Sequence, residues 1–396
     1  MVTAWFPPTN GVAVNRMKSF AKYLREDHVV DVFTLGETDK VQESAEGSVY
    51  YLASNSILQA IKHRSGDTKL IHHGKTVLNV LANKLELSEL SEWKKRVIAS
   101  IETAHEATPY DIVLSSYAPL EAHDIALAFK KKYPSLKWIA DMRDEMSHNP
   151  FFSGHSKVRL ALKEAEYVPY VDALTTVSDP ILQDFKTIFT STKFFEEVRN
   201  GFDHELKAVS VNNEKFTMVF AGTFYGKLKP DHFLKVLSNL VQEHRIGHDV
   251  LIKFVGTHHN FQIPSNLISM IEFVPRLPYI EAVDQMRKAD CNLLFCPPFE
   301  AKGRFTGKLF DYLSVERPIL AMVDKEDVGA ELVLEHNAGQ VADFYDEVEI
   351  KDAFCIIYDN WKNKVEFQPD ASKTSSLHRS HQVRKLNALI QRIFAS

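Results

Sequence analysis

Residues 303–313 read GRFTGKLFDYL, and residues 317–321 read RPILA. Thr306 belongs to the residue types that precede helices, and the apolar residues after it recur at the spacing of one helix face. The first segment therefore predicts a short helix that begins near Thr306. The apolar run after Arg317 predicts a strand.

The charged residues of this predicted helix suggest a ligand. Arg304 and Lys308 flank the helix start, where free N–H groups and the helix dipole favour an anion. Asp311 follows Lys308 by three residues, so both side chains share one face. The pattern suits a nucleotide, with its phosphates at the helix start and its sugar hydroxyls at the carboxylate. The alternative is a surface helix with a solvated Lys–Asp pair, because such pairs are ordinary.

Length and composition predict a two-domain globular protein. The chain has 396 residues, of which 45% are apolar and 25% charged. Its 47 basic and 52 acidic residues give a net charge of −5, which argues against nucleic acid as a partner. No signal-peptide pattern or membrane-spanning run is present, so we expect a cytoplasmic protein whose membrane attachment, if any, is peripheral. Residues 54–84 mix basic and apolar side chains, as in a membrane-surface helix or a solvated insertion.

Short apolar runs alternate with helical patterns along the whole chain. The predicted strands are 29–35, 111–115, 138–141, 173–177, 216–221, 250–256, 290–295 and 318–323. The predicted helices are 12–27, 87–107, 120–132, 179–189, 230–244, 279–288, 327–336 and 375–394. This alternation predicts an α/β chain with two doubly wound parallel sheets. We expect Rossmann-like domains at 1–203 and 216–374, with segment 375–396 packing back on the first and the ligand cleft between them.

Four turns after predicted strands supply further candidate site residues. The turn with Asn10 and Gly11, followed by Arg16, has the glycine geometry of a loop that approaches a phosphate or a sugar. Charged residues follow the strand 138–141, and His123 begins a predicted helix. The turn after strand 216–221 carries two lysines before a helix. These candidates are Asn10, Gly11, Arg16, His123, Asp141, Arg143, Asp144, Gly222, Thr223, Lys227 and Lys229.

Several catalytic motifs are missing from the sequence. It contains no H-E-x-x-H, no Walker loop, no paired Cys-x-x-Cys and no G-x-S-x-G. We therefore expect no metal site, and we expect Lys and Arg side chains to neutralise the diphosphate.

In their order along the chain, these segments resemble the family-four glycosyltransferases with the GT-B fold. They are most similar to the bacterial members that build capsular, O-antigen and exopolysaccharide units. The matching segments are F-P-P-x-x-G at 6–11 with Arg16, Y-D-I-V at 110–113, S-S-Y-A-P at 115–119 with His123, W-I-A-D-M-R-D at 138–144, V-R-N-G-F-D at 198–203, F-A-G-T at 220–223, T-G-K-L-F-D-Y-L at 306–313 and R-P-I-L at 317–320. The resemblance spans nearly the whole chain.

The resemblance implies a retaining sugar transfer without a bound metal or cofactor, from a UDP- or GDP-linked donor. The implied acceptor is a saccharide, carried on a polyprenyl diphosphate at the inner membrane face. Arg304, Lys308 and either Lys227 or Lys229 would neutralise the diphosphate. Thr306 and the Gly307 backbone would donate to it, and Asp311 would accept from the ribose. The acceptor side would be lined by Gly11, His123, Asp141, Arg143 and Asp144, and the last four of these would be the catalytic residues.

Two departures from the family pattern keep other functions open. The family commonly has two glutamates separated by seven residues, whereas this chain has Gly303 and Asp311 at those positions. The first strand, before Trp5, is also very short. The alternatives are a nucleotide-sugar 2-epimerase of the same fold and a non-catalytic partner subunit of a polysaccharide-assembly complex.

Overall fold

A computed structural model describes residues 1–54, 90–204, 211–258 and 260–395. The chain forms two compact units, Met1–Val198 with Val383–Ser396 (unit 1) and Arg199–Gln382 (unit 2). Residues 199–203, placed with the first half by the sequence, pack in unit 2, where Phe202 is fully buried and pairs with His378. Most of the basic segment 54–84, the start of the helix expected at 87–107 and part of the linker expected at 203–215 lie outside the described residues.

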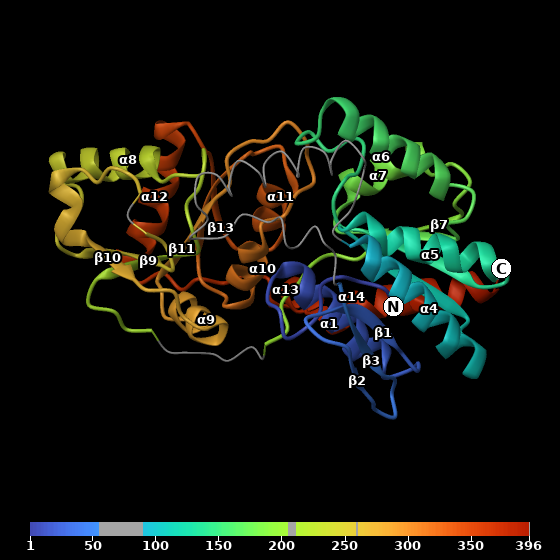
Figure 1. Cartoon of the computed structure of the whole chain (residues 1–396). Helices are drawn as coiled ribbons and strands as arrows, with labels where there is room; N and C mark the ends of the chain where they lie inside the picture. The colour runs from blue at the N-terminus through green and yellow to red at the C-terminus, as the bar shows by residue number, and fades with distance from the viewer. Residues whose placement is uncertain (55–89, 205–210, 259, 396) are drawn as a thin grey trace, which may run out of the picture. The chain divides into compact units, whose positions relative to one another are not determined.

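Unit 1 has two groups of strands, the first of which lies near the N-terminus in Figure 1. Its elements are α1 (Val12–Leu24), β1 (Val32–Gly36), β2 (Lys40–Gln42), β3 (Val49–Ala53), α4 (Ser91–Ala107), β4 (Ile112–Tyr117), α5 (Leu120–Lys132), β5 (Lys137–Met142), α6 (Gly154–Tyr167), β6 (Ala173–Thr176), α7 (Asp179–Ile188), β7 (Phe194–Glu197) and most of α14 (Arg379–Ala395). The strand orders are β1-β3-β2 and β4-β5-β6-β7. Val2 forms parallel bridges with Phe33 of β1 and Ser115 of β4, and so closes the gap between the two groups.

Helices cover both faces of the unit 1 strands. On one face, α4, α5 and α7 pack a core that includes the fully buried Trp93, Phe129 and Phe185. On the other face, α1 packs together with α14, which brings Leu386 against Phe20 and the central strands. The strands are therefore shielded from water on both sides, which explains their near-continuous apolar sequences.

Unit 2 contains one parallel sheet of six strands in the order β10-β9-β8-β11-β12-β13. Its elements are β8 (Phe216–Ala221), α8 (Asp231–Gln242), β9 (Val250–Val255), a 3-10 helix η1 (Ser265–Met270), β10 (Ile271–Val274), α9 (Tyr279–Arg287), β11 (Cys291–Phe295), α10 (Gly307–Ser314), β12 (Ile319–Val323), α11 (Val328–Glu335), β13 (Gly339–Asp343), α12 (Glu347–Lys362) and α13 (Ala371–Ser376). The prediction of parallel, doubly wound α/β architecture is confirmed.

Alternate residues of β8 show how the unit 2 sheet is covered. Phe216, Met218 and Phe220 point into a core shared with α8 and α12, whereas Val219 and Ala221 point into a core shared with α9, α10 and α11. Successive strand residues face opposite sides of a sheet, so both sides of β8 are apolar. In a parallel sheet, the helix that follows a strand begins at the carboxyl edge of the sheet. α10 and α11 follow β11 and β12, so they begin at this edge, where α/β proteins bind ligands.

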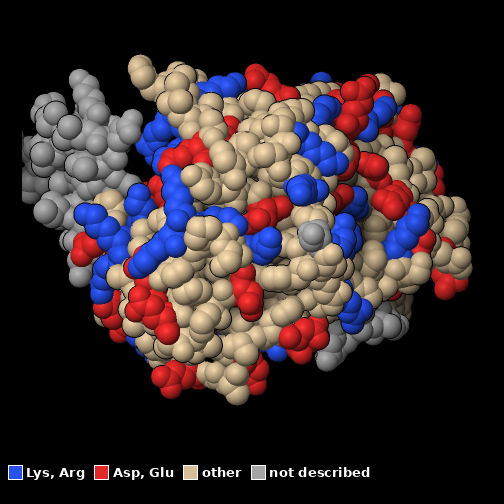
Figure 2. Space-filling view, turned by 90° about the vertical axis from the view of Figure 1, so that its right-hand side faces the viewer, with Lys and Arg blue, Asp and Glu red and all other residues tan. Residues whose placement is uncertain are grey.

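The surface carries both signs of charge. Figure 2 shows Lys and Arg interspersed with Asp and Glu over most of one face, with basic side chains gathered along part of it. Within the described residues, no helix combines the length and the apolar character that crossing a bilayer requires.

Candidate functional site

The helix predicted from residues 303–313 is present as α10, at the carboxyl edge of the unit 2 sheet. Leu309, Phe310 and Leu313 anchor it, because all three are almost completely buried in the core beneath it. Thr306 occupies the position before the helix, as expected, but its hydroxyl accepts no hydrogen bond from the first helical N–H groups. Its Oγ1 is buried without a partner among the described residues. The start of α10 therefore has a buried polar group that no described residue satisfies.

Lys308 is half-buried and lies over Gly222, the residue directly after β8. A Cβ added to Gly222 would sit 2.1 Å from Lys308 Cε, and the backbone φ of Gly222 is +142°. Only glycine fits at this position, because a side chain would be strained and would displace the lysine. The structure thus brings together Gly222 and Lys308, which are 86 residues apart in the sequence.

The Lys308 ammonium makes no ion pair within the described parts of the chain. Its Nζ lies 5.1 Å from the centroid of the Phe220 ring. Burial lowers the pKa of Lys308, because an ammonium loses hydration there. A partly desolvated cation without a carboxylate partner is costly, and a bound anion would relieve that cost.

Asp311 does not pair with Lys308, so the surface-helix alternative with a solvated Lys–Asp pair is not what the structure contains. Instead, the Tyr279 hydroxyl donates to Asp311 Oδ1 at 2.6 Å. Burial raises the pKa of Asp311 to about 6, while the Tyr279 hydrogen bond opposes that rise. The carboxylate is therefore ionised at neutral pH and has a second oxygen available to accept from a ligand hydroxyl.

His204 and Ser314 connect to the backbone of Asp311 rather than to its carboxylate. The Ser314 hydroxyl donates to the Asp311 backbone oxygen at 2.6 Å, so it accepts from His204 Nε2 at 2.7 Å. Burial lowers the pKa of His204 to about 4, which leaves the ring neutral. Tyr279 and His204 were not predicted as site residues from the sequence. Tyr279 opens a predicted helix that follows a proline, the position where a strand-to-helix loop reaches a ligand.

The other predicted donor-side residues are distributed around α10. Thr223 and Lys227 are exposed and Lys229 is half-buried, and no contact joins either lysine side chain to Lys308 in the described structure. Asp231 lies in the first turn of α8, where its carboxylate competes with any anion for the helix N-terminus. The two helix starts are therefore not equivalent, and α10 is the better anion site. Arg304 and Thr306 line a small hollow beside Asp327 and Cys296.

Among the residues predicted for the acceptor side, Asp141 and Arg16 form a buried ion pair in unit 1. Arg16 Nη2 lies 2.7 Å from Asp141 Oδ1, and both side chains are at most 2% exposed. The hydroxyls of Ser116 and Thr175 also donate to Asp141, at 2.8 and 2.9 Å. Burial alone would raise the pKa of Asp141, but Arg16 and Ser116 hold it below its usual value. We assign this pair a structural role, since it joins α1 to three strands and is closed to solvent.

His123 is likewise completely buried. Its Nδ1 accepts from Ser115 Oγ at 2.7 Å, because that hydroxyl itself accepts from the Trp138 indole N–H. Burial lowers the pKa of His123 to about 4, so the ring stays neutral, and its complete burial keeps it away from any ligand at the surface. We therefore assign His123 to the core.

Arg143 and Asp144 remain at the carboxyl edge of the unit 1 strands. The Arg143 guanidinium donates to the backbone oxygens of Tyr117 and Ala118, at 2.7 and 3.0 Å. Asp144 is half-exposed. The turn of Asn10 and Gly11 is exposed, and an added Cβ at Gly11 would meet no atom within 4 Å. Arg143, Asp144, Asn10 and Gly11 are thus the accessible members of the predicted acceptor side.

No family profile matches the sequence, and no curated protein matches it. The fold, however, is similar to solved structures of GT-B glycosyltransferases over the whole chain. Sucrose-phosphate synthase from Thermosynechococcus elongatus is 11% identical, with a TM-score of 0.63, and the alignment covers 100% of this chain and 98% of that one. The lipopolysaccharide outer core galactosyltransferase WaaB is 13% identical, with a TM-score of 0.60 and 99% coverage of both chains. Anabaena Alr3699/HepE in complex with UDP is 12% identical, with a TM-score of 0.58, covering 99% and 100%. The predicted GT-B fold is confirmed.

Proposed function

We propose that this chain is a glycosyltransferase that moves a sugar from a nucleotide-sugar donor to a saccharide acceptor. The observation that carries the proposal is the half-buried Lys308 ammonium, which has no carboxylate partner in the described structure and lies over Gly222 at the start of α10. The GT-B fold supports it, and a structural neighbour, HepE, was solved with UDP and with UDP-glucose.

Each side chain at the start of α10 has a role in this proposal. Lys308, the Thr306 hydroxyl and the N–H groups at the start of α10 stabilise the negative charge that develops on the departing diphosphate. Preorganised charges of this kind commonly supply the largest catalytic contribution. Asp311 accepts hydrogen bonds from the ribose, and Tyr279 holds its carboxylate in place. Arg304 adds a second positive charge near the helix start.

We further propose that transfer retains the anomeric configuration and needs neither a metal nor a cofactor. The cations at α10 supply the charge that a divalent ion would otherwise provide. By resemblance, the acceptor is a growing surface polysaccharide on a polyprenyl diphosphate, and the enzyme works in the cytoplasm with peripheral contact to the inner membrane face. Arg143 and Asp144 then contact the acceptor.

Thermal unfolding with nucleotides tests the donor site directly. We expect UDP or GDP at 100 times its Kd to stabilise the protein by about 2.7 kcal/mol. Lys308→Ala should remove the shift, whereas the exposed Lys288→Ala on the same unit should keep it. If neither nucleotide nor its common sugar derivatives shift unfolding at millimolar concentration, the proposal fails.

The reaction products test the metal requirement, the stereochemistry of transfer and the alternative functions. Transfer that continues in EDTA supports metal independence, and NMR of the new linkage reports retention or inversion. Conversion of UDP-N-acetylglucosamine without an acceptor would instead identify a 2-epimerase. Nucleotide binding without turnover, across lipid-linked and free acceptors, would identify a partner subunit.

A further inference from the structure

A second pocket lies at the opposite edge of the unit 2 sheet, around the amino ends of β8, β9, β11, β12 and β13. Its volume is about 850 Å³ and its lining runs from Val211 to Gln368, entirely within unit 2. The six residues of β8 separate the two edges by roughly 20 Å. The pocket is thus distinct from the site at Lys308, and it has the size of a small-molecule site.

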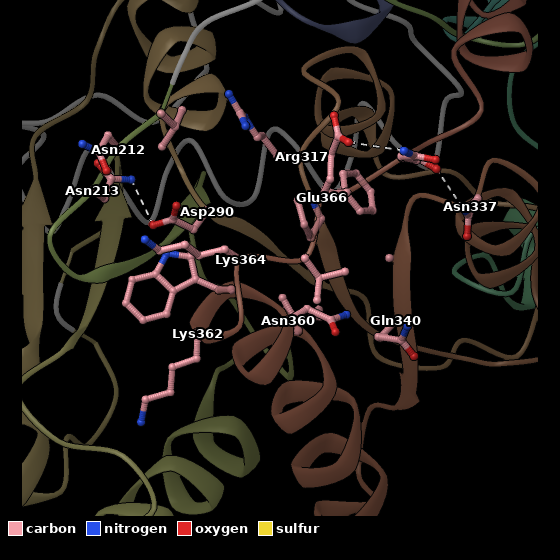
Figure 3. A pocket seen from close by; sticks show the side chains of 18 of the residues that line it. Asn212, Asn213, Asp290, Arg317, Asn337, Gln340, Asn360, Lys362, Lys364 and Glu366 are labelled. Carbon is pink, nitrogen blue, oxygen red and sulfur yellow. Dashed lines mark hydrogen bonds between the residues drawn. The ribbon is translucent and has the colours of Figure 1, made fainter.

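Carboxamides dominate the polar lining of this pocket. Six amide side chains contribute to it, namely Asn212, Asn213, Asn337, Gln340, Asn360 and Gln368. Figure 3 shows Asn212 and Asp290 toward one end of the view and Gln340 and Asn337 toward the other. The amide groups of Asn212, Gln340 and Asn360 make no hydrogen bond with any described residue. Each carboxamide offers two donors and an acceptor, which suits hydroxyl groups that both donate and accept.

The pocket lining has equal numbers of acidic and basic side chains, and most of the acidic ones already accept hydrogen bonds from the protein. Three acidic side chains face three basic ones, Asp249, Asp290 and Glu366 against Arg317, Lys362 and Lys364. The Tyr358 hydroxyl donates to Asp249 at 2.5 Å, and Thr217 N donates to Asp290 at 2.8 Å. A lining without net charge gives little electrostatic preference for an anion.

Trp361 provides an aromatic surface beside these amides. Its ring packs 5.4 Å from the Phe216 ring and 6.0 Å from the Tyr358 ring, so the core fixes its position while the residue still lines the pocket. A fixed aromatic ring offers apolar contact at low entropic cost. The C–H faces of a sugar ring can pack on this aromatic ring, and the sugar hydroxyls can form hydrogen bonds with the surrounding amides.

We propose that this pocket binds a neutral oligosaccharide and so holds a glycan away from the nucleotide site. The inference rests on the pocket's chemistry, and it adds a second saccharide site to the proposed transferase. Bound there, a glycan chain would keep the protein on its polymer between encounters with donor.

Ligand-observed saturation-transfer NMR on the full chain tests the proposal. The probes are maltotetraose, cellotetraose and chitotetraose, each measured with and without saturating UDP. We expect saturation transfer to at least one probe, unchanged by UDP. The double variant Gln340→Ala/Asn360→Ala should weaken the binding of that probe at least tenfold. The matched double variant Gln242→Ala/Gln262→Ala removes two exposed amides outside the pocket and should leave binding unchanged.

Two further variants separate the test of the pocket from the test of the nucleotide site. Lys308→Ala should abolish UDP stabilisation yet leave the oligosaccharide signal, so failure of the transferase proposal and failure of this one are distinguishable. Gln340→Glu preserves side-chain shape and controls for any loss of folding in the double variant. The proposal is overturned if no probe receives saturation, if the pocket variants leave it intact, or if UDP or Lys308→Ala removes it. Binding of inorganic phosphate, rather than a neutral probe, that depends on Gln340 and Asn360 also overturns it.

Discussion

Replacing Lys308 with methionine removes the ammonium but keeps a flexible chain over Gly222. A unit charge 4 Å from a phosphate oxygen contributes about 4 kcal/mol at an effective dielectric constant of 20. Removing water from both groups offsets part of this, and a charged hydrogen bond contributes about 1.5–3 kcal/mol net. We therefore expect Lys308→Met to weaken UDP binding roughly 10- to 150-fold by titration calorimetry.

The same substitution should not destabilise the free protein. The lost contact with the Phe220 ring costs about 0.5–1 kcal/mol, and relief of the desolvated charge opposes it. The melting temperature without ligand should therefore fall by no more than about 2 °C. Lys288→Met, on an exposed position, controls for a nonspecific loss of charge. UDP affinity within twofold of the wild-type value would refute the assignment of Lys308 to the diphosphate.

Three further substitutions test neighbouring contacts. Gly222→Ala places a Cβ against the overlying lysine and should lower UDP affinity at least tenfold, and a normal affinity would argue against this packing. Burial raises the pKa of Asp311 to about 6 in the folded protein. The Asp311 side chain therefore stabilises the folded state fully below its pKa in the unfolded chain, which is near 4, and this contribution is lost as the pH rises toward 6. Ribose binding needs the ionised form, so the UDP affinity gap between wild type and Asp311→Asn should widen from pH 5 to pH 7, and a constant gap would exclude a role for ionisation. Asp141→Asn leaves the buried Arg16 charge uncompensated and should lower the free energy of unfolding by about 3–5 kcal/mol in urea titrations; a loss below 1 kcal/mol would contradict the assignment of a structural ion pair.

Local patterns predicted the regular elements well where the pattern was continuous. The strand expected at 216–221 and the helix expected at 120–132 match β8 and α5 at both ends, because each is a single apolar run or stripe. β10 and β7 were not predicted, since each has four residues at a sheet edge and no fully buried side chain. α12 was not predicted either, although Asp346 caps it by accepting from the Val348 and Glu349 N–H groups.

Side-chain partners were harder to predict than elements, because they depend on how distant loops meet. Tyr279 and Asp311 are 32 residues apart, and Arg16 and Asp141 are 125 apart. Spacing alone placed Lys308 and Asp311 on one helix face, which is compatible with a surface ion pair. Two contacts separate the two interpretations: Asp311 accepts from Tyr279 instead of pairing with Lys308, and Gly222 leaves room for the lysine. No pattern in one sequence specifies those contacts.

Gly303, which stands where the resembled family commonly has its first glutamate, also fixes the geometry of the loop before α10. Its φ is +95°, and its N–H donates to Asp327 Oδ1 at 2.6 Å, while the same oxygen accepts from Val328 N at 2.8 Å. The loop before α10 is thus tied to the start of α11 through a backbone conformation that favours glycine.

Gly303→Ala should therefore lower the free energy of unfolding by about 1–2 kcal/mol, because a Cβ is strained at positive φ. Gly329→Ala, in the first turn of α11 with no atom within 4 Å of the added Cβ, should leave stability unchanged or raise it by up to about 1 kcal/mol. Urea unfolding of the two variants side by side measures the difference. Equal stabilities would mean that position 303 tolerates a side chain, and that the contact between Asp327 and the loop does not require glycine there.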